Sequence, residues 1–229
     1  MNIFSSTEYW AVFISIASYL LTYWVQKKTK KTLFNPLLIS TAITVIFLLL
    51  IRVDYEGYYS KAKYLHYLLT PATVCLAIPL YEQLSLLKKN IKAIIIGICS
   101  GVLTSLTSIL LFSMIFNFSH QMYVTLLPKS VTAAMGMGIS EELDGISSLT
   151  VPIIIMTGIT GNMIAEKVCK LFRINDPIAK GIAIGTASHA MGTAKALEMG
   201  ETEGAMSSLS IAVSGIVTVL LAGIYSKLY

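Results

Sequence analysis

The sequence predicts an all-α integral membrane protein with about six full transmembrane helices and two re-entrant or broken half-helix tips in an inverted repeat. Of its 229 residues, 55% are hydrophobic and only 13% are charged, and its mean hydropathy is +0.73. A soluble protein carries roughly 25% charged residues. Apolar runs close to the roughly 20 residues that cross a bilayer core recur along the chain; they cover residues 10–25, 33–51, 64–87, 91–116, 147–168 and 205–225.

We therefore expect residues 1–229 to form one transmembrane domain with four parts. Residues 1–63 would be a scaffold hairpin, and residues 64–121 a broken helix and a packing helix. Residues 122–172 and 178–229 would each be a tip followed by a span.

Basic residues indicate the orientation. The net charge of +5 comes from lysines and arginines at the ends of apolar runs, so no nucleic-acid partner is expected. One cluster, Lys27, Lys28, Lys30 and Lys31, follows the first run, and another, Lys88, Lys89 and Lys92, precedes the fourth. The positive-inside rule makes both clusters cytoplasmic and leaves the N-terminus outside. The first run is full length and continues into lysines, which does not fit a cleaved signal peptide.

The first half of the chain is predicted to be mainly scaffold. Residues 52–63 are polar and aromatic and are expected to form a solvated interfacial loop. The third run contains Pro71 and Pro79, each of which removes a backbone donor. This favours a broken helix that lines a cavity, with a simple kink as the alternative.

The fourth run, residues 91–116, combines small and hydroxyl residues. Gly97 and Gly101 have GxxxG spacing, and the hydroxyl residues are Ser100, Thr104, Ser105, Thr107 and Ser108. Small residues let helices approach closely, so we predict a packing or homodimer face. The three cysteines, Cys75, Cys99 and Cys169, are isolated and are predicted to be core residues, without a metal or cofactor.

Residues 128–145 form the first predicted tip. Pro128, Lys129 and Ser130 fit a helix N-terminus, and the small residues that follow suit a half-helix that enters the bilayer and returns. A broken but complete span is the alternative. Complete crossing would leave the later basic residues Lys167, Lys170, Arg173 and Lys180 outside, so the positive-inside rule favours re-entry.

The order of features repeats at an offset of about 60 residues. Lys129 and Ser130 lead through acidic residues to Gly145 and a span, and Ser188 and His189 lead in the same way to Gly204 and the last span. One full crossing separates the tips, so they would enter from opposite sides. Inverted repeats with discontinuous helices are typical of secondary transporters; chance similarity is the alternative.

The tips contain the groups that a small organic anion needs. Helix N-termini, hydroxyls and a cation can replace the hydration of a carboxylate. The candidate binding residues are Lys129, Ser130, Thr132, Asn162, Thr186, Ser188, His189, Thr193 and Lys195. Lys195 is an alternative cation or simply pairs with Glu198, and His189 either couples protons or is a neutral core residue. The chain has no catalytic motif, so we do not expect an enzyme.

The same residues resemble the LrgB/CidB family of bacterial membrane proteins over nearly the whole chain. The resemblance rests on Thr70-Pro-Ala-Thr-Val-Cys-Leu-Ala-Ile-Pro-Leu-Tyr81, on Leu127-Pro-Lys-Ser-Val-Thr132 and above all on Gly185-Thr-Ala-Ser-His-Ala-Met-Gly-Thr-Ala-Lys-Ala-Leu-Glu198. Ala133 and Ala134 stand where the family more often has Thr-Pro, which puts the detailed shape of the first tip in doubt. Lys195 stands where the family has Arg. Lysine keeps the positive charge but cannot form the two parallel hydrogen bonds of a guanidinium group.

The resemblance implies two different functions at the bacterial cytoplasmic membrane. Family members are described as antiholin-like modulators of murein hydrolase export and cell lysis, acting with a small LrgA/CidA-type partner. Related proteins include a plastid glycolate/glycerate translocator and pyruvate transport systems. The polar tips favour a secondary transporter of small monocarboxylates, and the antiholin-like regulator is the alternative. A channel is a third possibility.

Overall fold

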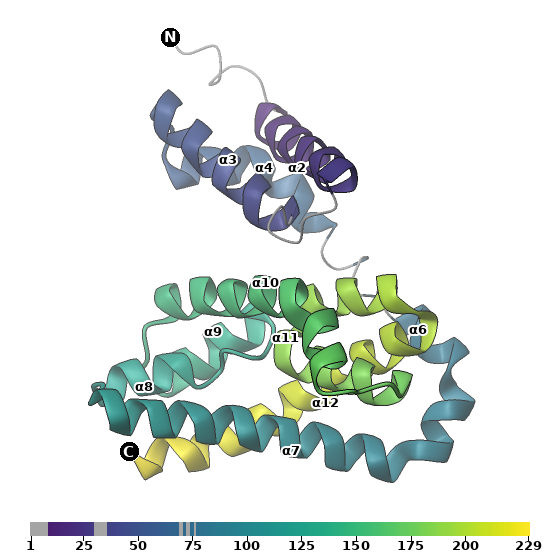
Figure 1. Cartoon of the computed structure of the whole chain (residues 1–229). Coiled ribbons are helices and arrows are strands. Elements are labelled where there is room, and N and C mark those ends of the chain that lie inside the picture. The colour runs from purple at the N-terminus through teal and green to yellow at the C-terminus, as the bar shows by residue number, and fades with distance from the viewer. Residues whose placement is uncertain (1–8, 30–35, 69–70, 72–73, 76) are drawn as a thin grey trace. The chain divides into compact units, whose positions relative to one another are not determined.

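The computed structural model describes residues 9–29, 36–68, 71, 74–75 and 77–229, and all regular elements in these ranges are helical. It divides into two compact units, Met1–Cys75 and Leu76–Tyr229, and each is described by itself (Figure 1). Lys30 and Lys31 of the predicted cytoplasmic cluster lie outside the described residues.

The first unit contains helices α2 (Trp10–Thr29), α3 (Pro36–Ile51) and α4 (Tyr55–Tyr67). Side-chain hydroxyls join α2 to α3: Ser18 Oγ lies 3.2 Å from Thr44 Oγ1, and Thr22 Oγ1 donates to the Pro36 carbonyl over 3.2 Å. These bonds pair α2 with α3; the predicted role of residues 1–63 as a scaffold hairpin stays a prediction.

Helix α4 corrects the prediction of an interfacial loop over residues 52–63. Arg52 ends α3 in a left-handed conformation with φ 54°, and α4 begins three residues later. Asp54 Oδ1 accepts a hydrogen bond from the Gly57 N–H over 3.2 Å, so a short side chain caps the start of the helix. The loop was predicted from polarity, but polar and aromatic residues also form a half-solvated helix.

The third apolar run, residues 64–87, is interrupted among its described residues, which agrees with the predicted broken helix; that it lines a cavity stays a prediction. Helix α4 ends at Tyr67, a short helix α6 covers Ala77–Glu82, and α7 starts at Leu84 after a turn at Gln83. Pro71 and Pro79 lie between the end of α4 and this turn, consistent with the lost backbone donors. Cys75 in the same segment is exposed, so its assignment to the core is wrong, whereas Cys99 is half-buried and Cys169 is buried.

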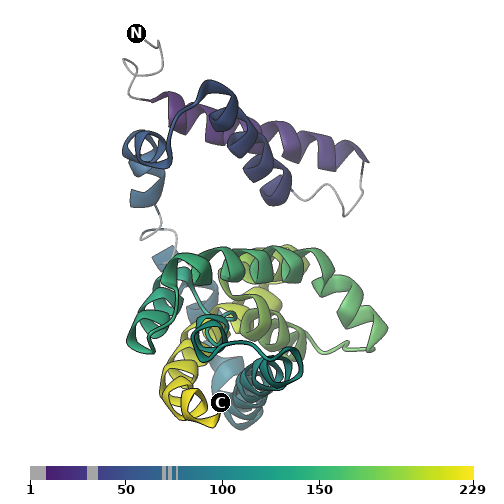
Figure 2. The ribbon, with the colours of Figure 1, turned by 90° about the vertical axis from the view of Figure 1, so that its left-hand side faces the viewer.

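The second unit contains α7 (Leu84–Phe116), α10 (Ser147–Leu171), α11 (Pro177–Met199) and α12 (Glu201–Tyr225). Within this unit α11 lies between α10 on one side and α7 and α12 on the other (Figures 1 and 2). Among the described helices, α7, α10 and α12 with its extension to Leu228 are long and apolar enough to cross a membrane, and α3 is a shorter apolar helix. An all-helical membrane protein is supported; the count of six spans stays a prediction.

The core of the second unit forms along the inner face of α7. Buried residues recur at Ile94, Ile98, Val102 and Leu106, four positions apart, as one stripe of a helix requires. They pack in one cluster with Tyr123 and with Met206 of α12. Ser100, Thr104, Ser105 and Ser108 of α7 lie beside this core and line a groove that residues of α11 also line.

Candidate functional site

The first tip is a turn between two short helices, α8 (His120–Leu126) and α9 (Ala133–Glu142). The Thr132 side chain caps α9 by accepting from the Met135 N–H over 3.5 Å. The predicted helix start at Pro128 is therefore wrong by five residues, because the threonine is the capping group and the buried Pro128 lies in the turn. At roughly 15 Å, a ten-residue α9 is too short to cross a bilayer.

Lys129 and Ser130 are held in this turn against α7. Lys129 Nζ donates to Ser105 Oγ and to Ser130 Oγ, both over 3.0 Å, and Ser105 Oγ donates to Ser130 Oγ over 3.2 Å. Among the described residues, no carboxylate lies within ion-pair distance of Lys129. A half-buried ammonium group thus bonds only neutral hydroxyls.

The second tip is a break inside α11. Asp176 caps the start of the helix, with Oδ1 accepting from the Ala179 N–H over 2.8 Å, and Pro177 occupies the first turn. At His189 the backbone leaves the helical region, with φ 43° and ψ −137°. The break lies at His189, where the second predicted tip begins; the sequence did not predict a break at this point.

The two ends of α11 lie close together, so the chain turns back at this break. Lys180 near its start and Lys195 and Glu198 near its end line one cavity of about 440 Å³. Lys195 Nζ is 3.1 Å from Glu198 Oε2 and 3.6 Å from Glu166 Oε2 on α10. In a straight helix, Lys180 and Lys195 would be roughly 22 Å apart along the axis. Re-entry into a membrane stays a prediction.

Helix α10 supports the break. An ideal Cβ on Gly158 would lie 2.7 Å from His189 Cε1, and the Ser188 side chain fills the space beside Gly161, so glycine lets the two segments approach. Asn162 Nδ2 donates to the Met191 carbonyl over 2.8 Å. His189, 4% exposed, has Nε2 3.1 Å from the Ile154 carbonyl.

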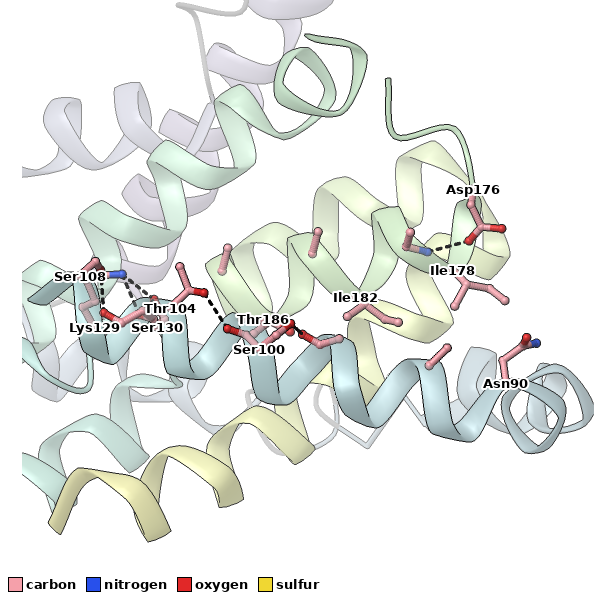
Figure 3. Close-up of a pocket in the computed structure, with 17 residues that line it drawn as sticks. Asn90, Ser100, Thr104, Ser108, Lys129, Ser130, Asp176, Ile178, Ile182 and Thr186 are labelled. Atoms are coloured by element: carbon pink, nitrogen blue, oxygen red, sulfur yellow. Dashed lines mark hydrogen bonds between the residues drawn. The ribbon is translucent and has the colours of Figure 1, made fainter. Parts of the chain in front are cut away.

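An open groove of about 800 Å³ runs between α7 and the first half of α11. Figure 3 shows Lys129 and Ser130 at one end of this α7–α11 groove, Asn90 and Asp176 at the other, and Thr186 projecting from α11 between them. The side chains that line much of the groove are small: they include Gly97 and Gly101 on α7 and alanines on α11. The groove therefore has a cation at one end and hydroxyls along its length.

The structure brings three predicted binding residues together and separates the others. Lys129, Ser130 and Thr186 line the groove. Thr132 caps α9, and Thr193 Oγ1 is 3.0 Å from the His189 carbonyl and 2.7 Å from Ser207 Oγ. The other predicted binding residues, Ser188, His189 and Asn162, lie in the contact between α10 and α11, and Lys195 lines the cavity with the glutamates.

The hydroxyl stripe of α7 is the part of the groove that sequence reasoning missed. Ser100, Thr104, Ser105 and Ser108 line the groove. The predicted packing role is supported at Gly97 and Gly101, where an added Cβ would lie 3.3 Å from Ile182 Cγ2 and 2.8 Å from Thr186 Cγ2. The spacing of hydroxyls was visible in the sequence, but the helix that they face was not. In the described part of the chain no three His, Cys, Asp or Glu residues come together as metal ligands.

Comparison of the sequence with known proteins identifies the family of this chain. The family model described as the LrgB-like family matches residues 15–228. The chain belongs to the LrgB-like family. It is 34% identical over 218 residues to the holin-like protein CidB of Staphylococcus aureus, covering 95% of each chain, and equally to that of Staphylococcus epidermidis. No solved structure shows significant similarity to it.

Membership of the LrgB-like family confirms the resemblance seen in the sequence motifs. The holin-like name of these CidB relatives supports a role at a membrane, as the apolar helices do.

Proposed function

We propose that this LrgB-like protein is a secondary transporter of small monocarboxylates, such as pyruvate or glycolate, and that it binds the anion in the α7–α11 groove. The observation that carries this proposal is the environment of Lys129. Its ammonium group bonds Ser105 and Ser130, and the described residues offer it no carboxylate. A partly buried charge normally has a partner of opposite sign. A bound anion would supply that charge.

The rest of the groove supports a small ligand. Hydroxyls and small side chains provide hydrogen-bond partners without filling the space. The residues at the cationic end come from both tips, since Lys129 and Ser130 belong to the first and Thr186 precedes the break in the second. A carrier needs such a site, because relative movement of two half-helices can then change its access.

Uptake into proteoliposomes tests the proposal. Labelled pyruvate and glycolate would be supplied to liposomes that contain this chain alone, with and without a pH gradient. We expect saturable uptake that Lys129→Met reduces at least about tenfold, since a charge-assisted hydrogen bond contributes roughly 1.5–3 kcal/mol. Lys129→Arg should retain part of the uptake, because arginine keeps the positive charge. Lys170→Met is the matched control, because Lys170 is exposed at the end of α10 and pairs with Glu166 outside the groove.

The second candidate is an antiholin-like regulator of a holin-type pore, and the name of the CidB relatives favours it. A regulator would move no substrate, and it would tolerate Lys129→Met as long as contacts with its partner remained. If flux arises only after an LrgA-like partner is added, the chain is one part of a permease. Absence of uptake under both conditions would contradict transport and favour regulation.

A further inference from the structure

A second, smaller cavity adjoins the α7–α11 groove where the two tips meet. It is lined by Val102, Ser105, Leu106, Leu127, Ser130, Thr186 and Thr218. Ser105, Ser130 and Thr186 line both this cavity and the groove. The smaller cavity is too narrow to admit a water molecule. It is a narrow extension of the groove with four hydroxyl residues around it.

Thr186 has a hydroxyl group that nothing in the described part of the protein satisfies. The residue is 5% exposed, and its Oγ1 is one of two buried side-chain polar atoms there without a hydrogen-bond partner; the other is Ser113 Oγ. Helical threonines commonly donate to the carbonyl four residues earlier, as Thr104 does to Ser100 over 2.8 Å. Thr186 does not, and a buried donor without a partner lowers stability.

We infer that this hydroxyl-lined cavity is an occluded subsite for the carboxylate of a small organic anion, and that Thr186 donates a hydrogen bond to it. The inference rests on the proposed function and assigns Thr186 a role in recognition. A carboxylate has two acceptor oxygens. Lys129 can bond one, since its ammonium group already bonds the two serines that line the cavity. Thr186 would bond the other when the tips part enough to admit the anion.

Packing is the competing explanation for Thr186. Its Cγ2 atom fills the space beside Gly101, where an added Cβ would lie only 2.8 Å away. Valine has nearly the shape of threonine and would fill that space equally well. Thr186→Val therefore removes the donor and keeps the packing, which separates the two explanations.

Binding of radiolabelled pyruvate to the purified full-length protein tests the inference, with thermal unfolding measured on the same samples. We expect Thr186→Val to unfold at the same or a higher temperature than the wild type and to bind pyruvate about ten- to a hundredfold more weakly. Thr186→Ser, which restores a hydroxyl, should recover most of the affinity. Ser113→Ala is the matched control: it removes the other unpartnered hydroxyl, which lies outside both cavities, and should leave binding unchanged.

The outcomes separate this inference from the proposed function. If Lys129→Met loses binding and Thr186→Val binds like the wild type, the groove remains a binding site and the occluded subsite is wrong. If the wild type binds no pyruvate and transports none, the inferred subsite and the proposed transport function are both contradicted. Equal loss of affinity in Thr186→Val and Thr186→Ser would also overturn the inference, because the hydroxyl would then not be the group that matters.

Discussion

At the scale of single residues, polar groups buried in the second unit fall into two kinds. Thr193 bonds the His189 carbonyl and Ser207, and Asn162 bonds the Met191 carbonyl, so these groups hold helices together. In the described part of the chain, Lys129 bonds two hydroxyls but has no carboxylate partner, and Thr186 Oγ1 has no hydrogen-bond partner. Satisfied buried polar groups stabilise a specific packing, whereas an unsatisfied one calls for an explanation; Ser113 Oγ is also unsatisfied, but of the two hydroxyls only that of Thr186 belongs to a residue that lines the groove. This contrast distinguishes a binding site from the structural polar residues around it.

His189 gives a prediction at this scale. Its φ of 43° and ψ of −137° lie where glycine is favoured, and such strain costs about 1–3 kcal/mol. His189→Ala keeps the strain and loses the Ile154 bond, so it should unfold at a lower temperature than both the wild type and His189→Gly. If the histidine mainly positions the backbone, His189→Gly keeps most of the uptake. A stable His189→Gly variant without uptake would instead favour proton coupling.

At the scale of elements, α11 depends on glycine wherever a neighbour approaches closely. Gly181 and Gly185 face the backbone of α12, and an added Cβ on Gly185 would lie 2.8 Å from Ser207 Cα. Because the obstacle is backbone, it cannot rotate away as a side chain would. The packing of α11 on α12 thus fixes the position from which Thr186 and the break at His189 project.

Gly185→Ala tests this packing. We expect a loss of about 1–3 kcal/mol of stability, as overpacking typically costs, measured by thermal unfolding in detergent. Gly223→Ala in α12 is the matched control, because an added Cβ there meets nothing within 4 Å and alanine favours helix. Equal stability of both variants and the wild type would show that the α11–α12 contact relaxes easily.

The same elements explain what the sequence could predict. Lys129, Ser130 and Thr186 could be identified because charged and hydroxyl residues next to Pro128 or within an apolar chain stand out. The hydroxyl stripe of α7 could not be identified as part of a binding site. Ser100, Thr104 and Ser108 bond carbonyls within their own helix and look like packing residues. The groove arises from the pairing of α7 with α11, which is a tertiary contact without a local signal. Polarity also predicted a loop where Asp54 starts helix α4.

At the scale of the whole molecule, the repeat of tip and span is the main expectation. In the second unit, a turn between α8 and α9 precedes α10, and the break in α11 precedes α12. The first copy of the repeat follows the predicted order, with Gly145 before α10, but Gly204 and Ser207 lie inside α12, so the predicted start of the last span after Gly204, at Ser207, is wrong. If α10 crosses the membrane once, the two tips enter from opposite faces. The direction of each tip and the orientation of the N-terminus stay predictions.

Labelling from one side tests this arrangement. Glu142 at the end of α9 and Glu198 near the end of α11 are both exposed. In cells that express cysteine-free protein, we expect a membrane-impermeant maleimide to label Glu142→Cys from outside. Glu198→Cys should react only after the membrane is permeabilised. Labelling of both from the same side would contradict the inverted repeat.

The most direct measurement is chemical rescue at position 129. Lys129→Cys would be made in a protein whose Cys75, Cys99 and Cys169 are replaced, and it would then react with an aminoethyl methanethiosulfonate that restores a positive charge. We predict that the unmodified variant takes up little pyruvate, that modification restores saturable uptake, and that pyruvate slows the modification. Uptake that is the same before and after modification, with no protection by pyruvate, would contradict an anion site at Lys129.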